Sequence, residues 1–211
     1  YASKHNDLKI IKYLIKNGAN IHANNDIIIR YASKHNDLKI IKYLIKNGVN
    51  INSLDNIEYE YIDDIKNELI NWASLNGDLN VIKYFDKQNK QIKYKYIEIL
   101  QNASKNGHLE IIKYLKNKGV NIHYKNDYIF IKAIENNQLE VIKYLVENGA
   151  NINNNVYGEE PLIPAIENNQ LKIVKYLVEN GANITNIYGE EALITAIENN
   201  HLKIVKYLVK N

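Results

Sequence analysis

A Lys-Tyr pair is the most regular feature of the sequence that could do chemistry. Seven copies recur at intervals of 30 to 41 residues, as Lys12-Tyr13, Lys42-Tyr43, Lys83-Tyr84, Lys113-Tyr114, Lys143-Tyr144, Lys175-Tyr176 and Lys206-Tyr207. A stripe of lysines could follow a phosphate backbone, and tyrosine rings could stack on bases. However, arginine, which reads guanine edges with two hydrogen bonds, occurs only as Arg30, and the net charge is only +3. We therefore expect solvated lysines beside tyrosines that fill the edge of a core, and nucleic-acid binding remains a remote alternative.

Histidines are the other residues that could support catalysis or metal binding. The six histidines are His5, His22, His35, His108, His123 and His201, and none lies three or four residues from another. The chain has no cysteine, and we find no G-x-S-x-G, H-E-x-x-H or glycine-rich phosphate loop. The sequence therefore predicts no catalytic residue, no cofactor and no metal site, and a protein that is not an enzyme.

The composition excludes several further classes of protein. Of 211 residues, 35 are Asn, 35 Ile, 26 Lys and 17 Tyr, and 45% are hydrophobic, which is too many for a disordered chain. No apolar run reaches the length of about 18 residues that a membrane helix needs. The first residues lack the pattern of a signal peptide, so we expect an intracellular protein that is not secreted. Because the chain begins with Tyr1 rather than Met, we expect a part of a longer protein, truncated within a repeat at both ends.

Internal repetition determines how these residues are arranged. Residues 1–18 and 31–48 are identical, and one alanine recurs at Ala2, Ala32, Ala73, Ala103, Ala133, Ala165 and Ala196. A leucine follows each of these alanines after six residues. This pattern predicts one array over residues 1–211, with units at about 1–25, 26–55, 56–96, 97–126, 127–155, 156–186 and 187–211.

Each unit is predicted to contain two helices, as residues 127–155 illustrate. Ile129, Ile131 and Ile134 fall in a short first helix, and the apolar residues from Leu139 onward form a helical stripe. Gly149 is placed to end the second helix, and polar, Asn-rich residues link it to the next unit. One unit of this size cannot bury both helices, whereas stacked units can. The fold class predicted is therefore an all-α solenoid.

The repeated strings resemble ankyrin repeats over the whole chain. Residues 106–115, NGHLEIIKYL, and 148–153, NGANIN, are similar to the second helix and the loop of that family. Residues 157–163, YGEEPLI, and 188–194, YGEEALI, are similar to its D-G-x-T-P-L-H segment, with Glu160 and Glu191 in place of Thr. The resemblance implies paired helices with projecting hairpin loops, stacked into a curved array that binds other proteins on its concave face. The Asn, Ile and Lys content further resembles ankyrin arrays of giant DNA viruses, which would place the protein in a host cytoplasm or a virion.

The third unit is irregular. An insertion at residues 53–64 is the most acidic stretch of the chain, and the only tryptophan, Trp72, follows it. Insertions in solenoids are placed in loops, often on the binding face. A tolerated surface insertion and a contact with a partner are both open interpretations.

The resemblance places the contact surface on the loop tips and the exposed part of each first helix. Tyrosines at loop tips are suited to anchoring an interface, and the acidic pairs at Glu159-Glu160 and Glu190-Glu191 are expected to project. The residues predicted to bind a partner are Lys34, His35, Asn76, Lys105, Tyr124, Tyr128, Glu135, Tyr157, Glu160, Tyr188 and Glu191.

The function predicted from these features is a non-enzymatic scaffold for protein–protein interaction, whose partner the sequence does not identify. Alternatives are a structural component of a virion or large complex and a substrate adaptor for a ubiquitin ligase. The ends of the array would expose apolar residues, so we expect further repeats or another subunit to cover them.

Overall fold

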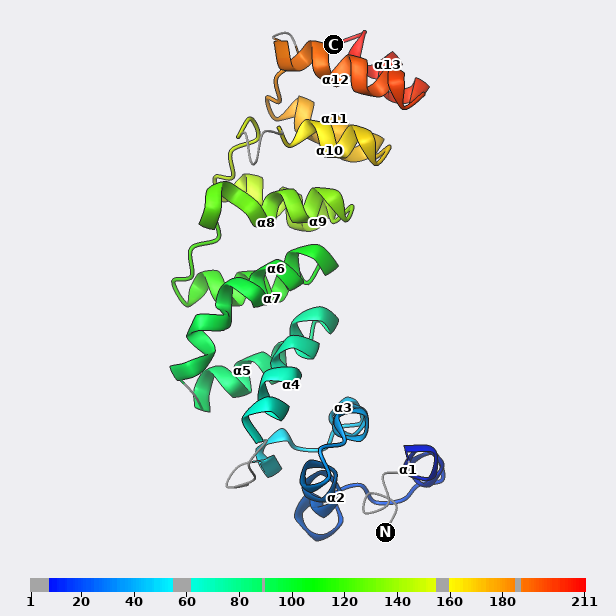
Figure 1. The fold of residues 1–211 in the computed structure, drawn as a ribbon, viewed down its shortest axis with the longest axis vertical. Helices are drawn as coiled ribbons and strands as arrows, with labels where there is room; N and C mark the ends of the chain where they lie inside the picture. The colour runs from blue at the N-terminus through cyan, green and yellow to red at the C-terminus, as the bar shows by residue number, and fades with distance from the viewer. Residues whose placement is uncertain (1–7, 55–61, 89, 155–159, 185–186) are drawn as a thin grey trace. The chain divides into compact units, whose positions relative to one another are not determined.

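The computed structural model describes residues 8–54, 62–88, 90–154, 160–184 and 187–211, and these residues contain α-helices, two 3-10 helices and no strand (Figure 1). The α-helices are α1 (Leu8–Lys16), α2 (Ala23–Lys34), α3 (Leu38–Lys46), α4 (Ile62–Asn76), α5 (Leu79–Gln88), α6 (Tyr96–Asn106), α7 (Leu109–Asn117), α8 (Tyr124–Glu135), α9 (Leu139–Glu147), α10 (Leu162–Glu167), α11 (Leu171–Glu179), α12 (Ile187–Glu198) and α13 (Leu202–Leu208). The 3-10 helices are η2 (Ile51–Leu54) and η3 (Lys90–Lys95). The predicted all-α fold is confirmed.

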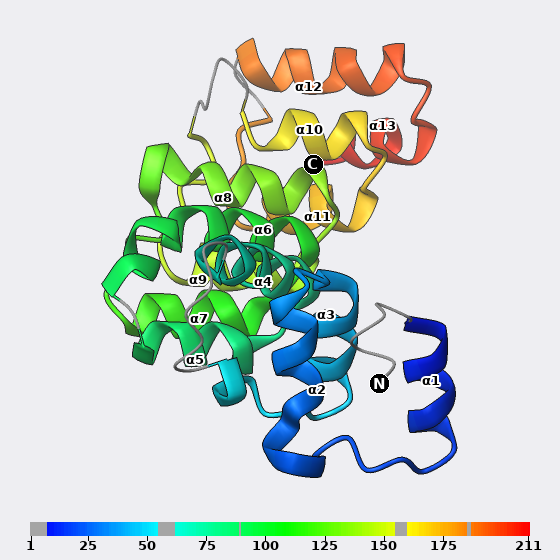
Figure 2. The same cartoon turned by 60° about the horizontal axis from the view of Figure 1, so that its bottom comes forward.

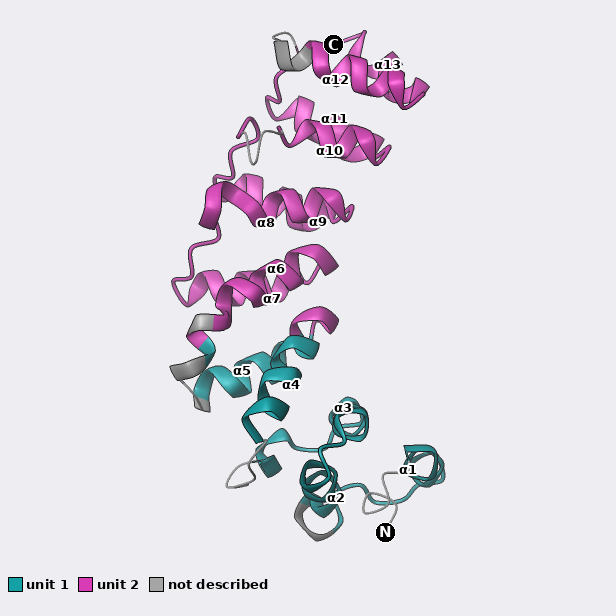
Figure 3. Cartoon of the chain, viewed as in Figure 1, with its two compact units in different colours: residues 1–73, 78–92 teal, residues 74–77, 93–211 magenta. Residues whose placement is uncertain are grey.

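The chain forms two compact units, which are described separately (Figure 3). The first contains residues 1–73 and 78–92, and the second contains residues 74–77 and 93–211. The prediction of one array over residues 1–211 stays a prediction. Most of the predicted insertion, residues 55–61, lies outside the described residues, as do residues 1–7.

The second unit consists of stacked helical pairs (Figures 1 and 2). The first helices of successive repeats, α6, α8, α10 and α12, pack side by side, and each also packs on the second helix of its own repeat. The second helices contact one another as well, α7 with α9 and α11 with α13. This arrangement is the helix-turn-helix stacking that the repeat period predicts.

The core of each repeat depends on a small residue in the first helix and two adjacent apolar residues in the second. The repeated alanine is fully buried in every described unit that contains it, for example Ala103, Ala133 and Ala165. Its small side chain allows neighbouring helices to approach closely. In the second helices α3, α5, α7, α9 and α11, both members of the apolar pair, such as Ile111 with Ile112, are at most 1% exposed.

Asparagine side chains end the helices, which explains their abundance. In the second helices, the Nδ2 of Asn148 donates a hydrogen bond to the Tyr144 carbonyl (2.6 Å), and Asn180 does the same to Tyr176 (2.8 Å). Each of these carbonyls also accepts the backbone N–H of the same asparagine at 3.1 Å, so the side chain adds a second hydrogen bond at the helix end. At the turn between helices, Asn137 adopts a left-handed backbone (φ 59°), which asparagine tolerates better than most residues.

At the start of the second helices α7 and α9, a side chain reaches back to the preceding repeat. The Nε2 of His108 lies 2.8 Å from the Leu75 carbonyl, and the Nε2 of Gln138 donates to the Lys105 carbonyl at 3.1 Å. Both carbonyls lie two residues after the repeated alanine, and the turn that follows each contains a glycine, Gly77 or Gly107. A Cβ at Gly107 would lie 2.3 Å from the Gln138 Oε1, so the glycine makes room for this bond.

This hydrogen bond to the preceding repeat differs in the repeats whose turn contains asparagine in place of Gly77 or Gly107. After Asn169, the Nδ1 of His201 meets the Ile166 carbonyl instead, at 2.8 Å, one residue earlier than in the other repeats. After Asn137, Gln170 makes no such bond, and its Oε1 is buried without a hydrogen-bond partner. The residue in the left-handed turn therefore helps to set the register between repeats.

We predict that Gly107→Ala destabilises the second unit more than Gly149→Ala does. Both glycines have positive φ, at 78° and 96°, so both substitutions incur about 1 kcal/mol of backbone strain. Only Gly107→Ala also displaces the Gln138 side chain from the Lys105 carbonyl, because no atom lies within 4 Å of a Cβ at Gly149. Urea denaturation should show an additional loss of about 1 kcal/mol. Equal losses for the two variants would contradict this role of Gly107.

Candidate functional site

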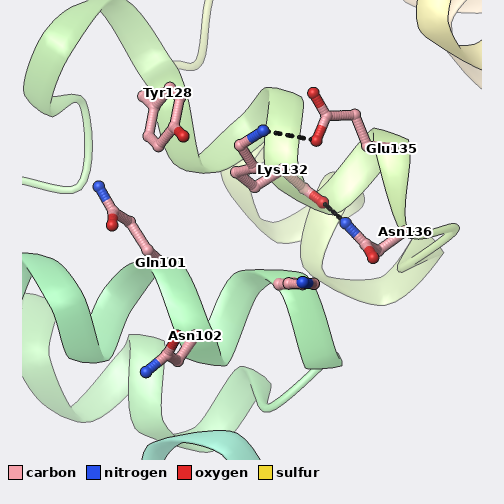
Figure 4. Close-up of a pocket in the computed structure, with 7 residues that line it drawn as sticks. Gln101, Asn102, Tyr128, Lys132, Glu135 and Asn136 are labelled. Atoms are coloured by element: carbon pink, nitrogen blue, oxygen red, sulfur yellow. Dashed lines mark hydrogen bonds and ion pairs between the residues drawn. The ribbon is translucent and has the colours of Figure 1, made fainter.

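A groove of about 450 Å³ lies between the first helices of two successive repeats, α6 and α8 (Figure 4). It is lined by Gln101, Asn102, Lys105, Tyr128, Lys132, Glu135 and Asn136. All of these side chains are polar, and both walls belong to the second unit. The groove is therefore suited to hydrogen bonding rather than to an apolar ligand.

The α8 wall carries an ion pair that satisfies its own charges. The Nζ of Lys132 lies 2.7 Å from the Glu135 Oε2 and 5.1 Å from the centroid of the Tyr128 ring. Burial alone would lower the pKa of Lys132, but the hydrogen bond and charge of Glu135 outweigh it, and the pKa is raised above 10.5. Lys132 is therefore a fixed cation, and Glu135 neutralises it.

The α6 wall is different because two of its polar groups have no partner among the described residues. The ammonium of Lys105 and the side-chain amide of Gln101 make no hydrogen bond or ion pair with any described residue. Asn102, by contrast, donates a hydrogen bond to the Ser74 Oγ at 2.8 Å. A ligand in the groove could therefore use Lys105 and Gln101 without breaking an existing contact.

Helical spacing aims these side chains into one space. Gln101 and Lys105 are four residues apart on α6, as Tyr128 and Lys132 are on α8, so each pair lies on one face of its helix. The bond from Gln138 to the Lys105 carbonyl fixes the end of α6 against the repeat that contains α8. The geometry of the groove thus follows from the stacking of the repeats.

Three of the residues predicted to bind a partner line this groove: Lys105, Tyr128 and Glu135. Lys34, His35 and Asn76 are exposed at the ends of α2 and α4, Tyr124 is exposed at the start of α8, and Glu191 is exposed on α12. Tyr157 and the Tyr188 side chain lie outside the described residues. The prediction did not include Gln101, Asn102, Lys132 and Asn136, although Gln101 and Lys132 lie one turn from predicted residues.

Glu160 does not project as the sequence analysis expected. It is only 7% exposed, immediately before α10, whereas Glu191 at the equivalent position is exposed. Burial raises the pKa of Glu160, and the negative charge of Glu191 raises it further. The helix that follows Glu160, α10, packs against both α8 and α12. A pattern of residue types does not reveal such packing.

The Lys-Tyr pairs connect neighbouring repeats along the second helices. In the second unit, the Lys113 ammonium lies 5.9 Å from the Tyr144 ring centroid, and that of Lys175 lies 5.5 Å from the Tyr207 ring centroid. Lys113 also lies 2.8 Å from Glu110, and Lys143 the same distance from Glu140. These lysines are thus engaged with rings and carboxylates of the protein itself.

The His123-Asp127 pair holds a loop in place rather than forming a candidate metal centre. The Nδ1 of His123 contacts the Asp127 carboxylate, and its Nε2 lies 3.0 Å from the Asn148 carbonyl. The other carboxylate oxygen of Asp127 accepts a hydrogen bond from the Asn151 backbone at 3.1 Å. Within the described ranges, no three His, Asp or Glu residues gather where they could hold a metal ion.

Comparison with protein families gives matches over nearly the whole chain. A model described as ankyrin repeats (3 copies) matches residues 1–55, 69–156 and 153–211. A second, described as ankyrin repeats (many copies), matches residues 29–85. No curated protein matches the sequence. None of the helices described in the structure is long and apolar enough to cross a membrane.

We predict that Glu160→Gln stabilises the protein at neutral pH. Because the folded chain raises the pKa of Glu160 above 4.5, the stability that this group contributes is fully present below that pH. It is lost as the pH rises through the raised value. Replacing the ionised carboxylate with an uncharged amide should therefore increase the free energy of unfolding at pH 7 by about 1 kcal/mol.

The gain from Glu160→Gln should disappear at pH values where Glu160 is protonated in both states. Glu198→Gln is the matched control, because it removes the same charge from an exposed position on α12. Thermal unfolding at a series of pH values measures both variants. A gain for Glu160→Gln that persists unchanged at acidic pH would show that burial of the charge is not its cause.

Proposed function

Because the chain belongs to the ankyrin-repeat family, whose members are generally protein–protein interaction modules, we propose that it binds a segment of a partner protein in the groove between α6 and α8. The observation that carries this proposal is the convergence of Lys105, Tyr128 and Glu135 on one groove. The resemblance to the family predicts these residues from their positions in the repeats alone.

The size and polarity of the groove support a protein segment as the ligand. A volume of about 450 Å³ accommodates a few side chains. The half-buried ring of Tyr128 offers a rigid contact surface, and tyrosine is enriched among residues that dominate binding energy. Gln101 offers a donor and an acceptor to a passing peptide backbone. The groove thus combines an aromatic contact with polar groups that fix orientation.

The structure supports nucleic-acid binding by the lysines of the second helices less well than it supports protein binding in the groove. Binding to a phosphate backbone requires lysines that can replace counterions. Lys113 and Lys143 each lie 2.8 Å from a glutamate of their own helix, so their charges are already neutralised in part. We therefore place the binding activity on the first helices.

A photo-crosslinking residue at Tyr128 should capture a partner protein in the native cell, whereas the same residue at Tyr176 should not. Tyr176 is also half-buried and lies in the same unit, but on the second helix α11, away from the groove. Mass spectrometry identifies the captured protein and the crosslinked segment.

The variant Gln101→Ala with Tyr128→Ala should lose most binding of that captured partner, because it removes the aromatic contact and an uncommitted amide from the groove. Circular dichroism should be unchanged, since neither side chain belongs to the fully buried core. Capture of the same partner from Tyr176, or full binding by the groove variant with its fold intact, would refute the proposed site.

A further inference from the structure

We propose that the groove selects partner segments that carry one acidic side chain, whose carboxylate is held by Lys105 and Gln101. This inference rests on the proposed function and specifies the chemistry of the partner. It depends on which polar side chains of the two walls already have a partner among the described residues and which do not.

The groove has an unmatched positive charge on one wall only. On α8, Lys132 and Glu135 neutralise each other at 2.7 Å. On α6, Lys105 is exposed, and no described residue pairs with its ammonium. Of the three charged side chains that line the groove, Lys105 is therefore the one whose charge is left for a ligand. An anionic side chain of the partner would complete the charge balance.

Lys105 and Gln101 are placed to act on the same ligand group. They are one helical turn apart on the same face of α6, and both line the groove. The ammonium and the side-chain amide are both hydrogen-bond donors, and a carboxylate offers two acceptor oxygens. Because Gln101 makes no bond with a described residue, it can turn its amide toward such a ligand. The pair matches one carboxylate better than it matches a neutral amide.

Negative charges near the groove limit the number of acidic residues that a partner segment can carry. Glu135 stands on the opposite wall, and exposed Glu167 belongs to α10, the first helix that packs next to α8. A segment with several acidic residues would be repelled along this face. The structure thus favours a single Asp or Glu in a segment that is otherwise neutral or basic.

The charge of Lys105 determines the sign of the electrostatic potential at the C-terminal end of α6. The carbonyl end of a helix carries a partial negative charge, which a lysine in the last turn offsets. Lys105 is the basic residue in the last turn of α6. Lys105→Glu would therefore reverse the potential at this wall of the groove, and the variant should select a basic residue where the wild type selects an acidic one.

The test is a selection from a phage-displayed library of random 12-residue peptides. It uses the full chain in four forms: wild type, Lys105→Glu, Lys172→Glu and Tyr128→Ala. Lys172→Glu is the matched control, since it makes the same charge change at an exposed position on the second helix α11. Circular dichroism of each form checks that it is folded.

Wild type and Lys172→Glu should enrich peptides with one Asp or Glu at a common position. Replacing that residue with Asn or Gln should weaken binding about ten-fold, the effect of a charge-assisted hydrogen bond. Lys105→Glu should lose these peptides and enrich Lys or Arg at the same position. If enriched peptides depend on Tyr128 but show no acidic preference, or if Lys105→Glu selects the same peptides, the inference is overturned while the proposed function stands. If no peptide is enriched, or if enriched peptides ignore Tyr128→Ala, both are overturned.

Discussion

The packing of α6 against the next repeat is the constraint on which the groove depends. The fully buried alanines Ala103 and Ala133 allow the first helices to approach, and the bond from Gln138 to the Lys105 carbonyl sets their register. Gly107 makes that bond possible because any side chain there would occupy the space of the Gln138 amide. A shift of α8 by one residue would turn Tyr128 and Lys132 away from Gln101 and Lys105. Stability and binding geometry therefore depend on the same contact.

The two layers of the second unit use their polar residues for different purposes. On the second helices, lysines lie over tyrosine rings of the next repeat or pair with glutamates, which strengthens the stacking. On α6, Lys105 and Gln101 make no hydrogen bond or ion pair with a described residue. A charge that pairs with no described side chain is available to a partner, so the α6–α8 groove is the best candidate for recognition.

Repetition made the helices, their order and the buried alanines predictable from sequence, because each unit repeats one pattern of apolar residues. Lys105, Tyr128 and Glu135 were also predictable as surface positions of a repeat. Gln101 and Lys132 were not, since only the packing of two helices shows that their side chains share one space. The burial of Glu160 escaped prediction for a similar reason: its residue type indicates an exposed position, and only tertiary packing encloses it. The pattern of residues within one repeat thus does not reveal which side chains meet between repeats.

Hydrogen–deuterium exchange with and without the bound partner tests the central claim most directly. If the partner lies between α6 and α8, the backbone amides of residues 96–106 and 124–136 should exchange more slowly in the complex. Those of the second helices α9 and α11, residues 139–147 and 171–179, should be unchanged. Protection of the second helices with no change in α6 and α8 would contradict the account, because it would place the partner on the opposite layer of the repeats.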